Sequence, residues 1–291
     1  MSGDRVTMNK TFSPEQFRMA AFDLDGTVLH RGRISERVRK ALTELRRSGV
    51  RLLIASGRDA AQISSELMSL FDYAVLANGS YTIDSCTGKT VFTHPMDTET
   101  VCRVIKTVRK SKGGAFLFLN GEMWGTVKGK NILLSRIPFA KRLSAMKEYS
   151  VNSCVSPRLE KKITADRRDV FKIQCFFRSQ TDSEKAAEKL RDLKKAEVLT
   201  MTDATLEITA KGITKAVSLR ELTAALGSDT EHMAAFGDSV NDMEMLKNCG
   251  FAVAMENGDS CVKEIADYIA GDVRHDGAAA AIYALYGIDE S

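Results

Sequence analysis

The sequence predicts an α/β protein in which a doubly wound parallel sheet carries an inserted α+β domain. Two observations predict the parallel sheet. Short apolar runs without polar alternation occur near both ends of the chain, as in strands that are buried on both faces, and helical patterns lie between these runs. A third observation predicts the insert, because the middle of the chain shows a hairpin pattern and then a different order of strands and helices.

Five apolar runs predict the strands of the core, and each run ends at small or polar residues. They are RMAAF before Asp23, VRLLIA before Ser56, YAVLA before Asn78, HMAAF before Gly237, and FAVAM before Glu256. Six segments with helical patterns lie between or after these runs: ISERVRKALTELRRSG, DAAQISSELMSLF, TKAVSLRELTAALG, NDMEMLKNCG, CVKEIAD and DGAAAAIYALYG. Strands that alternate with helices predict a Rossmann-like core.

The middle of the chain predicts a separate α+β domain. TIDSCTGKTVF indicates a hairpin around Thr87-Gly88, and the segments after it alternate differently: DTETVCRVIKTVRK (helix), GAFLFLN and VFKIQCFFR (strands), DSEKAAEKLRDLKKA (helix) and LEITA (strand). The predicted organisation is a flexible tail over 1–16, a core over 17–83 and 206–291, and an insert over 84–205.

Composition limits the class of protein. The chain has 291 residues, 44% of them hydrophobic, and its 42 basic and 38 acidic residues give a net charge of +4, which is too small to indicate a nucleic-acid partner. Its six cysteines show no C-x-x-C pair, which favours a reducing compartment. A polar N-terminus and the lack of a long apolar run predict a cytoplasmic protein without a membrane partner, as a monomer or a weak homodimer.

Acidic and polar residues follow the predicted strands. Ligands of doubly wound folds bind outside the carboxyl ends of the strands, so four residues are expected at one edge of the sheet: Asp23, Ser56, Asn78 and Asp238. Asp23 and Asp25 repel each other, and a cation shared with Asp238 would offset this repulsion. Mg²⁺ suits the site because it prefers oxygen ligands and few carboxylates. Without the other residues, Asp23 and Asp25 would indicate only a strand end followed by an Asp-Gly turn.

Four separated motifs carry a resemblance to a known family. They are Asp23-Leu24-Asp25-Gly26-Thr27, Ser56-Gly57-Arg58, Lys215 in KGITK, and Gly237-Asp238-Ser239-Val240-Asn241-Asp242. In this order, and at strand ends, they resemble the haloacid dehalogenase-like (HAD) phosphohydrolase superfamily. The similarity is to its Cof-type branch, which has an inserted α+β cap domain that selects the substrate. The resemblance extends over about residues 18–287.

The resemblance implies a role for each acidic residue. Asp23 would be the nucleophile that forms an aspartyl-phosphate. Asp25 would be the general acid for the leaving alcohol and then the base for water, with its backbone carbonyl facing the metal. Asp238 would bind Mg²⁺, and Asn241 and Asp242 would support the metal and phosphate shell. The predicted metal residues are therefore Asp23, Asp25, Asp238 and Asp242.

The resemblance also implies a phosphate site. Ser56 and the Gly57 amide would hold phosphate oxygens at the start of a helix, where free N–H groups point outward. Arg58 would lie near the phosphate entrance, and Lys215 would neutralise the phosphate and Asp23. Taken alone, Ser56 could be a helix cap, Arg58 a surface residue and Lys215 an exposed helix lysine. Asn78-Gly79 could be no more than a turn.

The resemblance implies a Mg²⁺-dependent phosphatase of small phosphorylated metabolites. Sugar phosphates are the first expectation and cofactor phosphates the second. Two other functions stay open, namely a phosphomutase that uses the same aspartyl-phosphate and a non-catalytic protein that binds a phosphorylated ligand. In the cap, Trp124 and Lys172 could contact the substrate or could serve packing alone.

Overall fold

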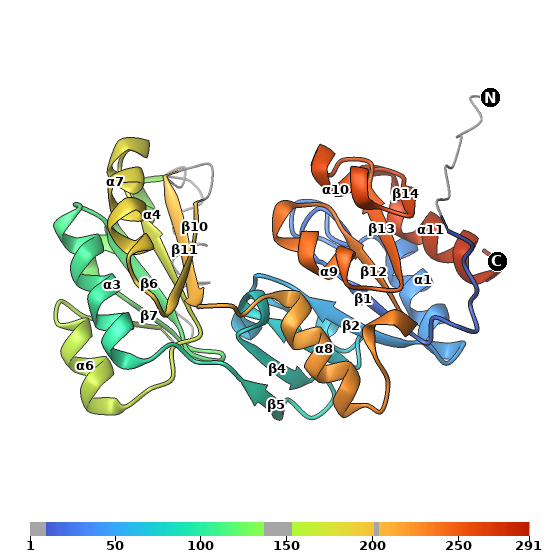
Figure 1. The fold of residues 1–291 in the computed structure, drawn as a ribbon, viewed down its shortest axis with the longest axis horizontal. Coiled ribbons are helices and arrows are strands. Elements are labelled where there is room, and N and C mark those ends of the chain that lie inside the picture. The colour runs from blue at the N-terminus through green and yellow to red at the C-terminus, as the bar shows by residue number, and fades with distance from the viewer. Residues whose placement is uncertain (1–9, 137–152, 201–203, 291) are drawn as a thin grey trace. The chain divides into compact units, whose positions relative to one another are not determined.

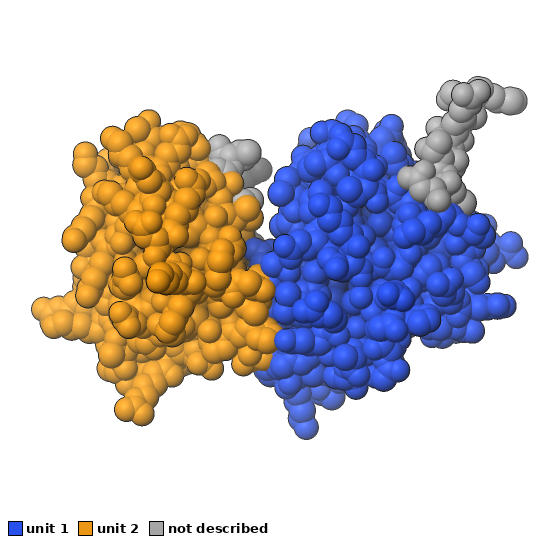
Figure 2. All heavy atoms as spheres, in the orientation of Figure 1, with its two compact units in different colours: residues 1–58, 63–92, 214–291 blue, residues 59–62, 93–213 orange. Residues whose placement is uncertain are grey.

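The structure of the protein is a computed structural model that describes residues 10–136, 153–200 and 204–290 (Figure 1). The chain forms two compact units, which Figure 2 shows in different colours. Unit 1 comprises residues 1–58, 63–92 and 214–291, and unit 2 comprises residues 59–62 and 93–213. Each unit has its own sheet and its own hydrophobic core.

Unit 1 contains an eight-stranded sheet with the order β14-β13-β12-β1-β2-β3-β4-β5. Its strands are β1 (Met19–Phe22), β2 (Arg51–Ala55), β3 (Tyr73–Leu76), β4 (Tyr81–Asp84), β5 (Thr90–Thr93), β12 (Met233–Gly237), β13 (Phe251–Met255) and β14 (Tyr268–Ala270). The six strands from β14 to β3 are parallel, and β4 is antiparallel to β3. The five strands predicted for the core are all present, and β14 is a strand that the prediction missed.

Helices cover this sheet on both faces, as the doubly wound prediction requires. They are α1 (Glu36–Arg47), α2 (Ser65–Met68), α8 (Lys215–Ala225), α9 (Met243–Lys247), α10 (Ser260–Ile265) and α11 (Gly277–Tyr286). Side chains of α8, α9 and α10 share one apolar cluster with alternate residues of the central strands. The buried side chains of α1 and α11, which pack against each other, lie outside that cluster.

One predicted helix is interrupted in the structure, and its two parts belong to different units. The helix expected after Asp59 is broken into a 3₁₀ turn (Ala60–Gln62) and the short α2, because Ser64 adopts an extended conformation and caps Leu67. The predicted tail is anchored over its described part. The ring of Phe12 contacts the rings of Phe17, Phe251 and Tyr286, with centroids 4.8 to 4.9 Å apart. Residues 1–9 lie outside the described residues.

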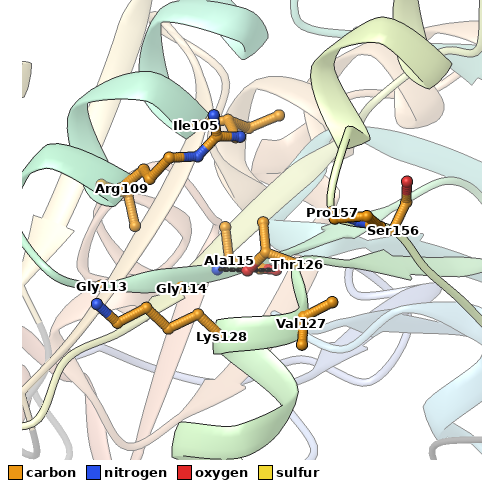
Figure 3. Close-up of a pocket in the computed structure, with 11 residues that line it drawn as sticks. Ile105, Arg109, Gly113, Gly114, Ala115, Thr126, Val127, Lys128, Ser156 and Pro157 are labelled. Atoms are coloured by element: carbon orange, nitrogen blue, oxygen red, sulfur yellow. Dashed lines mark hydrogen bonds between the residues drawn. The ribbon is translucent and has the colours of Figure 1, made fainter.

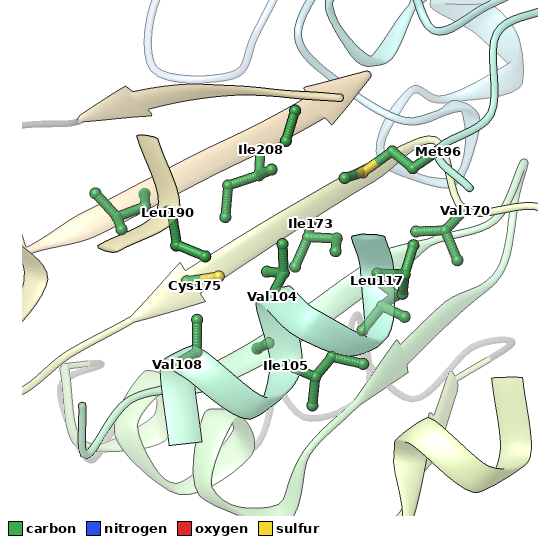
Figure 4. Close-up of a cluster of buried hydrophobic side chains, with 14 of the residues drawn as sticks. Met96, Val104, Ile105, Val108, Leu117, Val170, Ile173, Cys175, Leu190 and Ile208 are labelled. Carbon is green, nitrogen blue, oxygen red and sulfur yellow. The ribbon is translucent and has the colours of Figure 1, made fainter. Parts of the chain in front are cut away.

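Unit 2 contains a six-stranded sheet with the order β10-β11-β9-β6-β7-β8. The strands are β6 (Gly114–Phe118), β7 (Met123–Gly125), β8 (Ser153–Val155), β9 (Lys172–Phe176), β10 (Ala196–Thr200) and β11 (Thr205–Ala210). The helices are α3 (Thr98–Lys110), α4 (Val127–Arg136), α6 (Leu159–Asp166) and α7 (Gln180–Arg191). Figure 4 shows how apolar residues of α3 and α7 meet one face of β6, β9 and β11.

The observed unit boundaries differ from the predicted insert of 84–205. β4 pairs with β3, so the predicted hairpin extends the sheet of unit 1. β11 pairs with β9 and β10, so the LEITA strand belongs to the sheet of unit 2. Strand pairing set both limits, and a single strand pattern does not reveal its partner. Among the described residues, no helix is both long enough and apolar enough to cross a membrane.

Candidate active site

The centre of the unit 1 sheet positions the first acidic residue. β1 and the first four residues of β12 have the same sequence, MAAF, and pair in parallel register over all four residues. The rings of Phe22 and Phe236 stack with centroids 4.5 Å apart. The Asp23 N–H donates to the Phe236 carbonyl at 2.9 Å, which continues the ladder by one residue. Asp23 is therefore held beside Asp238, which follows β12.

Lys215 reaches this edge from the first residue of α8. Thr214 precedes it and approaches Gly79 so closely that a Cβ on Gly79, whose φ is +101°, would collide with the Thr214 carbonyl. This close contact fixes the start of α8 beside the sheet. Lys215 is 1% exposed, and its Nζ donates to Asp23 Oδ1 at 2.6 Å and to Asp242 Oδ1 at 2.7 Å.

The acidic residues form one cluster with an excess of negative charge. Oxygen atoms of Asp23, Asp238 and Asp242 lie within 4.8 Å of one another. Lys215 is the ammonium group that pairs with two of these three carboxylates, so the four side chains carry a formal excess of two negative charges. The arrangement has the ligand type and the charge that suit a divalent cation.

Burial makes these negative charges costly. It raises the pKa of Asp23 from 3.8 to about 8 against the opposing effect of Lys215, and it raises the pKa of Asp238 from 3.8 to about 6. Burial alone would lower the pKa of Lys215, but Asp23 and Asp242 outweigh burial and raise it. Lys215 is therefore a permanent cation, and a further positive charge would favour ionised Asp23 and Asp238.

Asp242 uses both carboxylate oxygens within the protein. Oδ1 accepts from Lys215, and Oδ2 accepts from the backbone N–H groups of Asp238 at 3.0 Å and Ser239 at 3.1 Å. Asp242 thus positions Lys215 and the loop after β12, and it also belongs to the cluster of three carboxylates that could hold a metal ion. Asn241 accepts from the Ser239 hydroxyl at 2.7 Å in the same loop.

Asp25 stands apart from the three clustered carboxylates. Its side chain is 55% exposed and accepts two hydrogen bonds from Arg58, one from Nε and one from a terminal nitrogen, each at 2.6 Å. The sequence prediction placed Asp25 at the metal by its backbone carbonyl and Arg58 at the phosphate entrance. In the structure the two side chains form an ion pair, and the predicted roles of the Asp25 carbonyl and of Arg58 remain predictions.

The second motif lies in a turn, and the prediction that a helix begins there is wrong. The Ser56 N–H donates to the Val75 carbonyl at 2.9 Å, and its hydroxyl accepts from the Arg58 N–H at 3.2 Å. A Cβ on Gly57 would lie 2.8 Å from Asn78 Oδ1, so a larger residue here would displace the Asn78 side chain. Any phosphate bound here would meet a hydroxyl and turn amides rather than a helix N-terminus.

Sequence reasoning gave no role to Thr27 of the first motif and missed Asn257, although both hold this motif in place. The Thr27 hydroxyl donates to Asp238 Oδ1 at 3.0 Å, and Asn257 Nδ2 donates to the Gly26 carbonyl at 2.9 Å. Gly26 has a φ of +89°, and a Cβ there would collide with the Asp238 carboxylate. The only sequence signal for Asn257 was its position just after the end of a predicted strand, FAVAM.

Two hollows lie in the described parts of the units. One, of about 670 Å³, belongs to unit 1 and is lined by residues that include Asn257, His30, Asp272 and His275. The other, of about 220 Å³, belongs to unit 2 and is shown in Figure 3 between the end of α3 and the start of α4. None of the predicted site residues lines either hollow.

The candidate residues of unit 2 have partners of their own. Trp124 is 5% exposed, belongs to the core of unit 2, and donates from Nε1 to Glu122 at 3.1 Å. Lys172 Nζ lies 3.3 Å from Glu207 Oε1 and 4.8 Å from the centroid of the Phe118 ring. Trp124 therefore packs in the core of unit 2, and Lys172 forms an ion pair within the same unit.

Comparisons with known proteins show the family of the chain. The family model of haloacid dehalogenase-like hydrolases matches residues 20–282. A 5-amino-6-(5-phospho-D-ribitylamino)uracil phosphatase of Bacillus subtilis is 28% identical over 268 residues, covering 91% of this chain and 94% of the relative. A phosphatase of the same name from Escherichia coli is 27% identical over 270 residues, covering 89% and 93%.

Solved structures share the fold. A haloacid dehalogenase-like hydrolase from Bacteroides thetaiotaomicron has a TM-score of 0.80 at 24% identity, over 92% of this chain and 99% of that one. A sugar phosphatase of HAD subclass IIB has a TM-score of 0.74 at 23% identity, over 93% and 99%. At this level of identity the likeness concerns the arrangement of the elements and not the substrate.

Proposed function

The chain belongs to the haloacid dehalogenase-like hydrolase family, and we propose that it is a Mg²⁺-dependent phosphatase that works through an aspartyl-phosphate on Asp23. Phosphatase activity on small phosphorylated metabolites follows from the family and from the named relatives. One observation carries the finer proposal. Lys215 is buried between Asp23 and Asp242, and Asp238 completes an acidic cluster within 4.8 Å.

The donor set fits Mg²⁺. Asp23 and Asp238 offer carboxylate oxygens, and the first-motif turn, which Asn257 holds through the Gly26 carbonyl, would add the backbone carbonyl of Asp25. Few protein carboxylates, with water and phosphate oxygens, are the usual ligands of this ion. When bound, Mg²⁺ would neutralise charge between the phosphoryl group and the carboxylates.

The residues of unit 1 would then divide the reaction into two displacements. An Asp23 oxygen attacks phosphorus, the bond to the ester oxygen breaks, and Asp25 gives that oxygen a proton. In the second step water attacks the aspartyl-phosphate and gives a proton to Asp25, and inorganic phosphate leaves. Lys215 offsets the charge on the phosphoryl oxygens throughout, while Ser56 and Gly57 orient them.

The proposed substrates are sugar phosphates first and cofactor phosphates second. The two relatives above are named for a substrate in which a phosphorylated ribityl chain is attached to a uracil ring. That compound combines a sugar-alcohol phosphate with a heterocycle, so it falls between the two proposed classes. It belongs in any substrate panel for this chain.

The test is release of inorganic phosphate from a panel of sugar, polyol, nucleotide and cofactor phosphates. Each compound is assayed with Mg²⁺, with a chelator, and with the Asp23→Asn variant. We expect metal-dependent release that the variant lacks. Release that survives in Asp23→Asn would refute the nucleophile, and transfer of the phosphoryl group between substrate positions without release would indicate a phosphomutase. Binding without either reaction would indicate a non-catalytic protein.

A further inference from the structure

The ion pair between Asp25 and Arg58 conflicts with the role proposed for Asp25. Both oxygens of the Asp25 carboxylate accept hydrogen bonds from one guanidinium group, at 2.6 Å each. A general acid must present a protonated oxygen to the leaving group. A carboxylate whose two oxygens both accept hydrogen bonds from a guanidinium cannot do so. Asp25 must therefore be released before it can serve the leaving group.

The ion pair between Asp25 and Arg58 is exposed to water, so it can be broken at low cost. The side chain of Asp25 is 55% exposed and that of Arg58 is 25% exposed. Ion pairs with this exposure contribute at most about 1 kcal/mol, because water screens them and both side chains lose freedom. Lys215, by contrast, is 1% exposed and fixed between two carboxylates. Of these two cations, Arg58 is the one that can change partner at low cost.

Arg58 also starts from the correct place to meet a phosphate. Its backbone N–H donates to the hydroxyl of Ser56, which is the proposed phosphate-binding hydroxyl two residues earlier. A guanidinium fork matches the oxygens of phosphate as well as it matches a carboxylate. An arriving phosphoryl group thus competes with Asp25 for the same N–H donors.

We propose that Arg58 exchanges partners during the reaction: it holds Asp25 in an ion pair until a phosphoryl group takes its guanidinium and releases the Asp25 carboxylate. Arg58 is then a positioning residue for Asp25 as well as a contact for phosphate. The exchange makes the freeing of Asp25 depend on the presence of substrate. It rests on the proposed function, since it assigns the phosphoryl group to the Ser56 turn.

A double-mutant cycle on phosphate binding tests the exchange without any turnover. The affinity for inorganic phosphate is measured by titration calorimetry, in Mg²⁺ at one pH, for wild type, Asp25→Asn, Arg58→Gln and the double variant. If Asp25 and phosphate compete for Arg58, then Asp25→Asn tightens phosphate binding by roughly twofold to fivefold when Arg58 is present. In the Arg58→Gln background the same change should have little effect.

Each other outcome of the cycle counts against the proposal. Equal tightening in both backgrounds would mean that Asp25 only repels phosphate by its charge, and no tightening would mean that the two do not compete. If wild type binds no phosphate, the proposed phosphate site falls together with the exchange. If phosphate binds without coupling, the exchange alone falls.

A matched control variant exists within unit 1. Arg37 makes the same two-armed contact with the Glu290 carboxylate, at 2.6 and 2.8 Å, and plays no part in the proposed site. Arg37→Gln removes the same charge from the same unit, and it should leave phosphate affinity unchanged. Arg58→Lys keeps the charge but loses the fork, so it should show less coupling to Asp25 than arginine does. Thermal unfolding of every variant verifies that the fold is retained.

Discussion

Each unit of the chain buries a lysine against acidic side chains, but the two lysines have different surroundings. Lys172 of unit 2 is paired with Glu207 at 3.3 Å and lies near the ring of Phe118. Lys215 of unit 1 is shared by two carboxylates, and Asp238 stands close by. The ion pair of Lys172 is with one carboxylate, whereas the three clustered carboxylates around Lys215 leave an excess of negative charge that a cation would balance.

This difference teaches that a buried lysine by itself does not indicate a catalytic site. The number of carboxylates around it is more informative, because each additional buried negative charge has to be compensated. An uncompensated cluster such as that of unit 1 is a cost to stability unless it binds something.

The largest expected effect is on turnover. Asp23→Asn should reduce phosphate release at least about a thousandfold, because an amide cannot replace a carboxylate nucleophile. Glu207→Gln removes the same charge beside the lysine of unit 2 and should reduce release less than about tenfold. Steady-state assays on the best substrate of the panel compare the two variants. Similar losses in both would break the distinction between the two lysine sites.

The second effect is on stability. Lys215→Met leaves two buried carboxylates without their cation and should lower the free energy of unfolding by about 3–5 kcal/mol at neutral pH without Mg²⁺. Lys172→Met leaves one carboxylate, on Glu207, which is 13% exposed, and should cost about 1–2 kcal/mol. Urea unfolding of both variants measures the difference. A greater loss for Lys172→Met would contradict the charge argument.

The third effect concerns Mg²⁺ and pH. In metal-free protein the raised pKa values of Asp23, about 8, and Asp238, about 6, mean that the folded state binds protons more tightly than the unfolded state. Their contribution to stability is complete below the unfolded value of 3.8 and falls as pH rises above it, until it is lost at about pH 6 for Asp238 and about pH 8 for Asp23. Metal-free unit 1 should therefore lose stability over this window.

Mg²⁺ should have the opposite dependence, because it binds the deprotonated carboxylates. Millimolar Mg²⁺ should stabilise wild type by about 1–3 kcal/mol at pH 8 and by clearly less at pH 5.5. Calorimetric melting with Mg²⁺ or with a chelator measures the shift. Asp238→Asn should abolish most of it, whereas Glu207→Gln should leave it intact. A shift that is independent of pH would argue against Mg²⁺ at this cluster.

The sequence was a good guide to elements that are specified locally. Uninterrupted apolar runs such as MAAF are buried strands in the structure, and the acidic residues after them do reach one edge of the sheet. Strand ends are predictable because a parallel sheet brings all its carboxyl ends to one edge. The rule places Asp23 and Asp238 at the same edge, and the pairing of β1 with β12 makes them neighbours.

Features that depend on tertiary pairing could not be predicted in this way. The sequence shows no sign that Asp25 forms an ion pair with Arg58. It also does not show that both carboxylate oxygens of Asp242 accept hydrogen bonds, from Lys215 and from backbone N–H groups. The hairpin before α3 shows the same limit, since only its pairing with β3 assigns it to unit 1. Local patterns specify an element, and the partner is chosen by the rest of the fold.

The smallest expected effect uses a device that both units share. Ser35 caps α1 in unit 1 by accepting from the Val38 N–H at 3.1 Å, and Asp97 caps α3 in unit 2 by accepting from the Thr100 N–H at 3.0 Å. Ser35→Ala and Asp97→Ala should each cost about 1 kcal/mol, because each leaves helix N–H groups without an acceptor.

These two variants also report on how far the units are independent. The carboxylates of the proposed Mg²⁺ site all belong to unit 1, so Mg²⁺ binding should be linked to the unfolding of that unit. If each unit unfolds independently, Mg²⁺ should raise the melting temperature that Ser35→Ala has lowered. It should not raise the melting temperature that Asp97→Ala has lowered. Calorimetric scans of both variants with and without Mg²⁺ measure this. Equal restoration in the two variants would show that the chain unfolds as one cooperative unit, and the contrast between the lysines would then concern charge alone.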